Sequence, residues 1–312
     1  MVLKKEFADY LALREKMNLP APWEISMEDF RSRTLPIRDF IGQPEPIFSI
    51  ENRIISGPNG YLPIRIYRPS AEPNLPVMLY FHGGGWVIGN MDGNEPTVCS
   101  LANKGNFVVV QVQYQKAPEH PFPAPFNDCY AALVWVVRNA DHLKIDATKI
   151  GVGGDSAGGN LAAAVAIKCR DTSLVELAFQ MLVYPCTGND GSLPSAIKNA
   201  EGYGLTSKIM RWFEFQYIGS DSDLLNPYAF PAYCKNLTGL APAVLVTAEF
   251  DPLADDGKLY AQALNAAEVP VVFKEFEGAI HGFNALAGVA PDVAKEAQLY
   301  LARSINSFLA RL

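Results

Sequence analysis

Short apolar runs alternate with longer mixed segments along most of the chain, starting near residue 50. Seven of these runs are rich in β-branched and aromatic residues, which favour strands. They are residues 64–67, 77–81, 107–112, 150–153, 181–184, 243–247 and 271–276. The helix-length segments between the later runs are residues 127–139, 158–170 and 255–267. Alternation of strand and helix predicts an α/β fold with a mostly parallel sheet, covered by helices on both faces.

The first 45 residues follow a different pattern, with apolar positions at helical spacing. These positions are Leu3, Phe7, Tyr10, Leu11 and Met17. The spacing predicts a helix that ends before Pro20. Ser26, followed three residues later by Asp29, resembles a capping box and predicts a second, short helix.

One long segment, between the runs that end at residue 184 and begin at residue 243, interrupts the alternation. A helix capped by Ser207 is predicted inside it. Its apolar residues are Ile209, Met210, Trp212, Phe213, Phe215, Tyr217 and Ile218. A helix that is apolar nearly all round must cover something on each side. It either covers the body on one side and a ligand on the other, or is an ordinary buried helix.

Composition and charge narrow the class of protein. Of 312 residues, 49% are hydrophobic and 19% charged, which is ample for a buried core. The net charge of −7 argues against a nucleic-acid partner, which requires a basic face. The five cysteines form no C-x-x-C pair, and five is an odd number, so neither a disulfide framework nor a zinc site is indicated. With no signal-peptide pattern and no apolar run near the ~18 residues of a membrane span, we expect a cytoplasmic protein without stable membrane insertion.

The clearest local motif is Gly154-Asp155-Ser156-Ala157-Gly158, which matches G-x-S-x-G. It directly follows one predicted strand and directly precedes a predicted helix, the context in which this motif forms a sharp turn. At such a turn the serine hydroxyl projects from the carboxyl edge of the sheet, and the neighbours two positions away must be small. The N-terminus of the following helix offers N–H groups to a developing oxyanion.

A second motif, His82-Gly83-Gly84-Gly85-Trp86, follows an earlier predicted strand. The sequence lacks the further glycine of a dinucleotide loop and the lysine of a P-loop, so phosphate binding is not indicated. Unshielded N–H groups in this position suit the second half of an oxyanion hole.

Together, HGGGW and the downstream GDSAGGN resemble the hormone-sensitive-lipase branch of the α/β-hydrolase family, which contains bacterial esterases and arylacetamide deacetylases. Three further loops are similar to loops of that family: residues 117–124, 250–257 and 281–283. The resemblance implies an α/β-hydrolase fold, with a mostly parallel central sheet of about eight strands and a helical cap. We expect one domain over residues 1–312, with the cap formed by about residues 1–45 and 187–235. Relatives often pair through the last strand, so a homodimer through residues 271–276 is a further expectation.

The resemblance also implies a role for each matching residue. Ser156 would be the nucleophile, His281 the general base and Asp251 the carboxylate that orients it. The expected oxyanion-hole donors are the backbone N–H groups of Gly83, Gly84 and Ala157. The chain order Ser, Asp, His also matches the order that α/β-hydrolases use. Asp255 and Asp256 compete with Asp251, although they look more like the first turn of a helix, where negative charge is favourable.

These expectations predict a carboxylic ester hydrolase that needs no metal or organic cofactor. Trp86, Trp212 and Phe213 are expected to confine the substrate, favouring small uncharged esters with short- to medium-chain acyl groups. An amidase or deacetylase could use the same residues. A chymotrypsin-type protease is excluded by the chain order. A non-catalytic receptor on the same scaffold, as in the plant gibberellin receptors, lacks the histidine that this chain has at His281.

Overall fold

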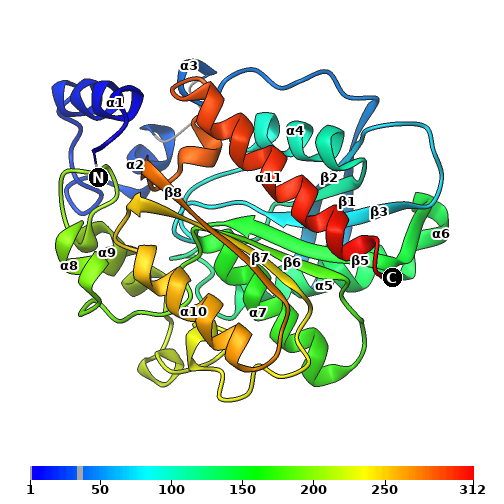
Figure 1. Cartoon of the computed structure of the whole chain (residues 1–312). Helices are drawn as coiled ribbons and strands as arrows, with labels where there is room; N and C mark the ends of the chain where they lie inside the picture. The colour runs from blue at the N-terminus through cyan, green and yellow to red at the C-terminus, as the bar shows by residue number, and fades with distance from the viewer. Residues whose placement is uncertain (1, 34–37) are drawn as a thin grey trace.

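A single sheet runs through the computed structural model of the chain, which describes residues 2–33 and 38–312. Its strands, in chain order, are β1 (Ser49–Gly57), β2 (Gly60–Arg68), β3 (Leu75–Phe81), β4 (Val108–Val112), β5 (Ile145–Asp155), β6 (Phe179–Val183), β7 (Ala243–Phe250) and β8 (Val271–Ile280). They lie in the order β1-β2-β4-β3-β5-β6-β7-β8 (Figure 1). Only β1 with β2 and β2 with β4 pair antiparallel. The other neighbouring strands are parallel, as the sequence predicts.

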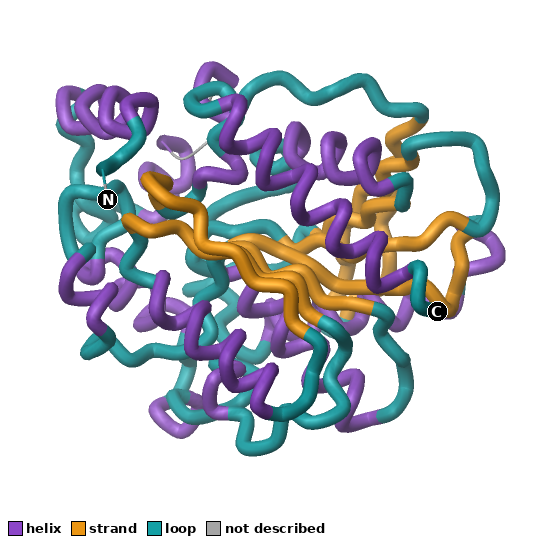
Figure 2. Tube along the Cα trace, viewed as in Figure 1, coloured by secondary structure: helices purple, strands orange, loops and turns teal. Residues whose placement is uncertain are grey.

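Helices cover both faces of this sheet (Figure 2). Those of the body are α4 (Glu95–Gly105), α5 (Ala124–Arg138), α6 (Ala140–Leu143), α7 (Ala157–Thr172), α10 (Ala254–Ala266) and α11 (Pro291–Leu309). In Figure 1, α4 and α11 lie above the sheet, and α5, α7 and α10 lie below it. The fold is therefore the α/β-hydrolase type of three-layer arrangement, with every parallel strand of the centre buried on both faces.

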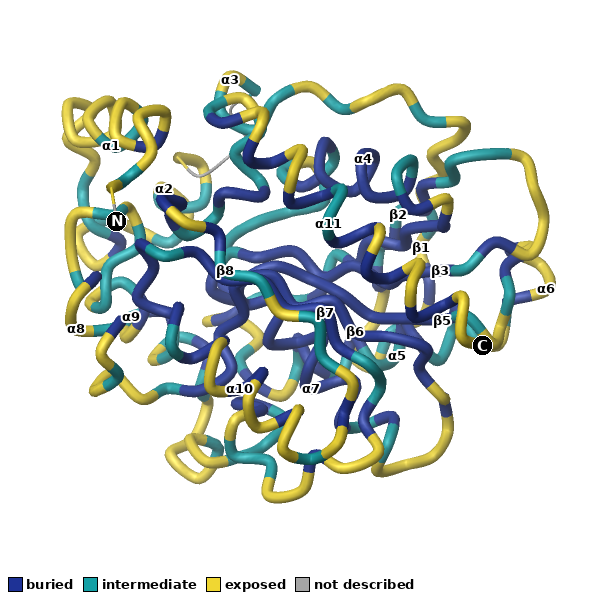
Figure 3. The backbone as a smooth tube through the Cα atoms, viewed as in Figure 1, coloured by how far each residue is buried: buried dark blue, intermediate teal, exposed yellow. Residues whose placement is uncertain are grey.

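Alternate side chains of the central strands enter two separate cores. On β3, Val77 and Leu79 pack in the cluster that contains α5, α7 and α10, whereas Met78 and Tyr80 pack in the cluster that contains α4 and α11. Because both faces of such a strand are buried, the strand is a continuous apolar run instead of an alternating one. The dark-blue centre of Figure 3 shows this buried layer.

All seven predicted strands are confirmed, with bounds that shift by a few residues. The eighth, β1, escaped the pattern because it lies at the edge of the sheet and most of its positions are exposed, so it has few buried apolar residues to reveal it. The three predicted body helices are α5, α7 and α10. The structure adds α4, α6 and α11, which fell outside the predicted segments.

The N-terminal predictions are confirmed in the described residues. The first helix is α1 (Lys5–Lys16) and the second is α2 (Met27–Arg33), followed after the undescribed residues 34–37 by α3 (Arg38–Ile41). The Asp29 N–H donates to Ser26 Oγ at 3.1 Å, and the Ser26 hydroxyl donates to Asp29 Oδ2 at 2.8 Å. The first of these bonds is the one expected of a capping box, whereas the second joins the two side chains and does not involve the Ser26 N–H.

The long segment between β6 and β7 forms α8 (Pro194–Lys198) and α9 (Ser207–Tyr217), with short 3-10 turns η1 (Asp221–Asp223) and η2 (Pro231–Tyr233). Two predictions about α9 are wrong. Thr206 caps it instead of Ser207, because Thr206 Oγ1 accepts the Ile209 N–H at 3.1 Å while Ser207 is already helical. The helix is also amphipathic, with Phe213 buried and the ring of Phe215 79% exposed.

The helices α1, α2, α8 and α9 gather at the end of the sheet toward which the arrows of β7 and β8 point (Figure 1). This is the carboxyl edge of the parallel strands, where loops between strand and helix form sites in open α/β sheets. Within residues 2–33 and 38–312, the helices include none with the length and apolar character that a membrane crossing needs.

Candidate active site

Four loops leave the strands β3, β5, β7 and β8 at the same edge of the sheet, with β6 lying between β5 and β7. Ser156 directly follows β5, Asp251 directly follows β7, and His281 directly follows β8. The glycine loop that begins at His82 follows β3, the neighbour of β5. Since these strands are parallel, all four loops emerge side by side.

The structure brings Ser156, His281 and Asp251 into one hydrogen-bonded row. The Ser156 hydroxyl lies 2.9 Å from His281 Nε2, and His281 Nδ1 lies 2.6 Å from Asp251 Oδ2. Because a carboxylate only accepts, the ring proton is on Nδ1, which leaves Nε2 to accept from the serine. The row runs inward from the surface, since Ser156 is 9% exposed and Asp251 is 0% exposed.

Further contacts hold Asp251 and His281 in place. The Leu253 N–H donates to Asp251 Oδ1 at 2.9 Å, which occupies the carboxylate oxygen that faces away from His281. The ring of Tyr184 lies 4.7 Å from the imidazole of His281, centroid to centroid, and fixes the plane of the ring from one side. An imidazole held in this way has one orientation available for proton transfer.

Ser156 itself has a strained backbone, with φ 56° and ψ −119°. Such angles are costly for a residue with a side chain and persist only where the surroundings enforce them. The surroundings are close-packed, because a Cβ on Gly154 would meet the Gly158 carbonyl oxygen at 2.5 Å and one on Gly158 would meet the Phe81 carbonyl oxygen at 1.9 Å. Small residues on both sides of the serine are therefore a steric requirement of this turn.

His82 supports the glycine loop from below. Burial lowers the pKa of His82 to about 3, so the imidazole is neutral. Its Nδ1–H donates to the Gly83 carbonyl oxygen at 2.8 Å, and the Tyr114 hydroxyl donates to the His82 carbonyl oxygen at 2.7 Å. The ring of Tyr114 stacks on that of His82, with the centroids 4.3 Å apart. This histidine therefore shapes the loop and takes no part in the row of Ser156.

The loop also corrects one expectation. The Gly83 N–H donates to Asp155 Oδ1 at 3.0 Å, so this N–H is already used within the protein. The same oxygen accepts the Tyr80 hydroxyl at 2.7 Å. By contrast, no atom of the described residues accepts the N–H of Gly84, of Gly85 or of Ala157. In the glycine loop, the unused N–H donors are therefore those of Gly84 and Gly85, whereas the predicted donors were those of Gly83 and Gly84.

The two competing aspartates have other partners. Asp255 Oδ2 accepts the Ser195 N–H at 2.8 Å. Asp256 Oδ1 accepts the Thr187 hydroxyl at 2.8 Å, and burial raises the pKa of Asp256 to about 6. Both lie in the first turn of α10, as expected from their position. Of the three aspartates, Asp251 is the one that contacts His281.

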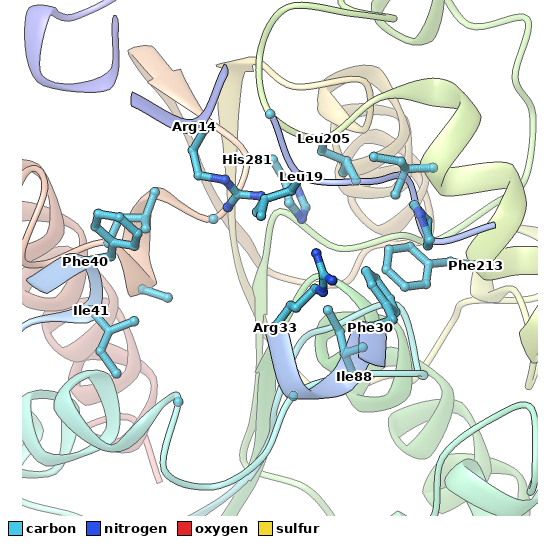
Figure 4. A pocket seen from close by; sticks show the side chains of 18 of the residues that line it. Arg14, Leu19, Phe30, Arg33, Phe40, Ile41, Ile88, Leu205, Phe213 and His281 are labelled. Atoms are coloured by element: carbon cyan, nitrogen blue, oxygen red, sulfur yellow. The ribbon is translucent and has the colours of Figure 1, made fainter. Parts of the chain in front are cut away.

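A cavity of about 690 Å³ opens above His281 (Figure 4). Phe213 lines it, whereas Trp86 and Trp212, which were also expected to confine the substrate, are not among its lining residues. Trp86 is 0% exposed, because its ring stacks on Tyr217 with centroids 4.2 Å apart, and its Nε1–H donates to Asn160 Oδ1 at 3.2 Å. The ring of Trp212 instead packs edge-on against Phe30.

Sequence reasoning missed several residues of this site. Asp155 carries no signal of its own, because its role depends on Tyr80 from the neighbouring strand β3. Arg14 and Arg33 line the cavity from the N-terminal helices, which contain no motif. Across residues 2–33 and 38–312, His, Cys, Asp and Glu side chains form no group of three or more that could hold a metal ion.

Comparison with known proteins identifies the family to which the chain belongs. Residues 78–285 match the model of a family described by its α/β-hydrolase fold. The chain is 40% identical to the esterase LipI of Mycobacterium tuberculosis over 277 residues, which is 86% of each protein. It is 33% identical to an arylesterase of Saccharolobus solfataricus over 284 residues, 91% of this chain and 92% of that one.

Solved structures agree over nearly the whole length. An ester hydrolase from the metagenome of Lake Arreo, complexed with a derivative of bipyridine phosphonate, has a TM-score of 0.94 at 34% identity and covers 99% of this chain and 100% of its own. A thermostable esterase from Pseudomonas putida has a TM-score of 0.94 at 30% identity and covers 99% and 98%. With this fold and these relatives, the chain belongs to the hormone-sensitive-lipase-like branch of the α/β-hydrolase family and is a carboxylesterase.

Proposed function

We propose that this carboxylesterase cleaves short- to medium-chain acyl esters through Ser156, with His281 as general base and Asp251 as its orienting carboxylate. The observation that carries the proposal is the hydrogen-bonded row from Ser156 Oγ through both ring nitrogens of His281 to Asp251, at 2.9 and 2.6 Å. Nucleophile, base and orienting acid within hydrogen-bond reach of one another are the geometric requirement for acyl transfer.

The reaction proceeds in two halves. Ser156 Oγ forms a bond to the ester carbonyl carbon while its proton passes to His281 Nε2. As the tetrahedral intermediate collapses, the bond to the alcohol oxygen breaks and the imidazolium returns the proton to the leaving alcohol. A water molecule then attacks the acyl-enzyme and loses a proton to His281. The bond between the acyl carbon and Ser156 Oγ breaks, the imidazolium returns the proton to Ser156 Oγ, and the acid is released. Asp251 stabilises the imidazolium that forms in each half and remains ionised.

The oxyanion of each intermediate is held, in this proposal, by the N–H groups of Gly84, Gly85 and Ala157. Two observations support the choice: those donors have no acceptor within the described residues, and Gly83 is occupied by Asp155. Ala157 is also the first residue of α7, so the positive end of the helix dipole faces the developing charge. Removing one such donor typically costs about a hundred- to a thousandfold in kcat.

We propose that α1, α2, α8 and α9 form a cap over this site and belong to the same domain as the sheet. Their contacts support it. A Cβ on Gly85 would meet the ring of Phe213 on α9 at 2.3 Å, so α9 packs directly on the glycine loop. From α2, Arg31 Nε donates to the Val87 carbonyl oxygen at 3.0 Å, which ties the N-terminal part of the cap to the same loop. Residue 1 and residues 34–37 of the expected cap lie outside the described residues.

A chain-length series of p-nitrophenyl esters tests the proposal, together with the matching anilide to separate ester from amide cleavage. We expect kcat/KM to fall from the short to the longest acyl chains, because acyl and alcohol parts share one cavity of about 690 Å³. Ser156→Ala should abolish hydrolysis while circular dichroism shows the fold unchanged. Equal rates on acetyl and palmitoyl esters would contradict the chain-length preference. Ester turnover by Ser156→Ala would contradict the catalytic assignment.

A further inference from the structure

Two arginines of the N-terminal helices line the cavity around His281. Arg14 lies in the last turn of α1, and Arg33 is the last residue of α2. Both are among the residues that line the cavity with His281. In Figure 4 the two guanidinium groups point into the same space from different sides, beside the imidazole of His281. The cavity that contains His281 therefore carries two positive charges, on arginines that are exposed to solvent.

Within the described residues, neither Arg14 nor Arg33 forms an ion pair with a carboxylate that lines the cavity. Asp155 is the one acidic residue among them, and its Oδ1 already accepts the Tyr80 hydroxyl and the Gly83 N–H. Arg14 Nη1 donates to the Tyr10 hydroxyl at 3.1 Å, which is a neutral partner. Among residues 2–33 and 38–312, neither Arg14 nor Arg33 has an acidic oxygen within 4.0 Å.

Two other arginines of the N-terminal region, Arg31 and Arg38, do pair with carboxylates. Arg31 pairs with Glu119 at 2.7 Å, and Arg38 pairs with Glu95 at 2.9 Å. Two guanidinium groups that share a cavity without such a partner repel each other, and an anion placed between them relieves that repulsion. The planar fork of a guanidinium also matches the two oxygens of a carboxylate.

The remaining side chains that line the cavity indicate the chemical character of the rest of the ligand. Apart from the arginines, most of the side chains around the cavity are apolar, among them Leu19, Phe30 and Ile88. An apolar wall with two cations at one side fits an ester with an apolar body and an anionic end. The expectation of an uncharged substrate was derived without these arginines. The sequence predicted a cap that includes about residues 1–45, but it did not show which of the side chains there line the cavity.

We propose that the enzyme prefers esters that carry a carboxylate away from the scissile bond, and that Arg14 and Arg33 bind this carboxylate. The inference rests on the proposed ester hydrolysis through Ser156 and names the substrate class of that site. The carboxylate can belong to the acyl part or to the alcohol part of the ester, and the two arms of the test distinguish these.

The test compares kcat/KM for matched charged and neutral esters, each after the rate of its spontaneous hydrolysis has been subtracted. The acyl arm uses p-nitrophenyl hydrogen glutarate against p-nitrophenyl isoheptanoate, which has the same shape without the charge. The alcohol arm uses meta-acetoxybenzoate against meta-acetoxybenzamide. We expect the charged-to-neutral ratio to exceed one in at least one arm, and to fall as ionic strength rises from about 0.05 M to about 0.5 M, since salt screens exposed charges.

The double variant Arg14→Gln/Arg33→Gln should lower that ratio about three- to tenfold, as expected for one or two partly exposed charge pairs. The loss should be in KM, because the carboxylate is bound equally in ground and transition state. The control Arg303→Gln/Arg311→Gln removes the same net charge at exposed positions outside the cavity and should keep the wild-type ratio.

Two results would overturn the inference: a ratio of one or less in both arms, or an unchanged ratio in the double variant. If the double variant does not fold, Arg14→Lys and Arg33→Lys keep the charge and must keep the salt dependence. Failure of the two proposals is distinguishable. A wild-type enzyme that cleaves the neutral esters without preference contradicts only this inference, whereas one that cleaves none of them contradicts the proposed function.

Discussion

At the scale of single residues, the glycine loop shows how a hydrogen bond changes an assignment. The sequence offers three consecutive glycines, and any two of them could supply N–H groups to an oxyanion. Asp155 accepts the N–H of Gly83 and so removes it from the set. Asp155 is positioned for this by the Tyr80 hydroxyl from the neighbouring strand, a contact between residues 75 positions apart that no local pattern reveals.

Asp251, the carboxylate that is hydrogen-bonded to His281, gives a prediction for a single residue. Asp251→Asn should lower kcat by about a thousandfold or more, because an amide at this position no longer stabilises the imidazolium or selects its tautomer. Asp255→Asn is the matched control, since Asp255 bonds to the Ser195 N–H and has no contact with His281. It should leave kcat close to that of the wild type. Similar losses in the two variants would contradict the assignment of Asp251.

At the scale of elements, the turn from β5 into α7 is determined by close packing. The sequence predicts it correctly because both the need for small residues and the helix that follows are local properties. The cap helix α9 was predicted less well. Its N-cap residue is Thr206 instead of Ser207. Phe215 is exposed, so the helix is not apolar nearly all round as expected. Which side of a helix is covered depends on the elements around it, here α2 and the glycine loop, and a single segment does not encode that.

Gly158→Ala tests the turn. In an ordinary helix, alanine stabilises relative to glycine by up to about 1 kcal/mol. Here the new Cβ would meet the Phe81 carbonyl oxygen at 1.9 Å, so we expect alanine to destabilise the protein. The free energy of unfolding, measured in urea, should fall by about 3 kcal/mol, the upper part of the range for overpacking. The control Gly191→Ala meets only the flexible end of Arg211, so little change is expected. A Gly158→Ala protein as stable as the control would contradict this packing.

Glu214 on α9 gives a prediction about the attachment of the cap. Burial, followed by the nearby charge of Asp256 on α10, raises the pKa of Glu214 to about 8. A carboxyl group with a raised pKa holds its proton more tightly in the folded state. Its contribution to stability is therefore complete at low pH and is lost as pH rises toward 8. The melting temperature of the wild type should fall between about pH 5 and pH 8 for this reason.

Glu214→Gln should flatten that part of the profile, because a glutamine stays neutral throughout. The control Glu201→Gln removes an exposed carboxylate from the same segment and should follow the wild type. Parallel profiles for Glu214→Gln and the wild type would show that this carboxyl group does not titrate in the way its surroundings indicate.

At the scale of the whole molecule, the sheet brings together residues that are far apart in sequence. Ser156 and His281 are separated by 125 positions, yet β5, β6, β7 and β8 are consecutive in the sheet. The core strands and the order of the three loops were predictable because buried parallel strands and glycine-rich turns leave local patterns. The edge strand β1 was not predictable, because most of its positions are exposed. The place of Arg14 and Arg33 at the cavity was not predictable either, because it depends on how α1 and α2 pack. Pairing of two chains through β8 stays a prediction.

Covalent labelling shows whether Ser156 is the nucleophile of this esterase. The enzyme is treated with a fluorophosphonate, which phosphonylates an activated serine, and is then examined by intact-mass and peptide mass spectrometry. We predict one adduct per chain, located on Ser156, formed in step with the loss of ester hydrolysis and absent from Ser156→Ala. Loss of activity with the adduct on another residue, or full activity with Ser156 labelled, would contradict the account.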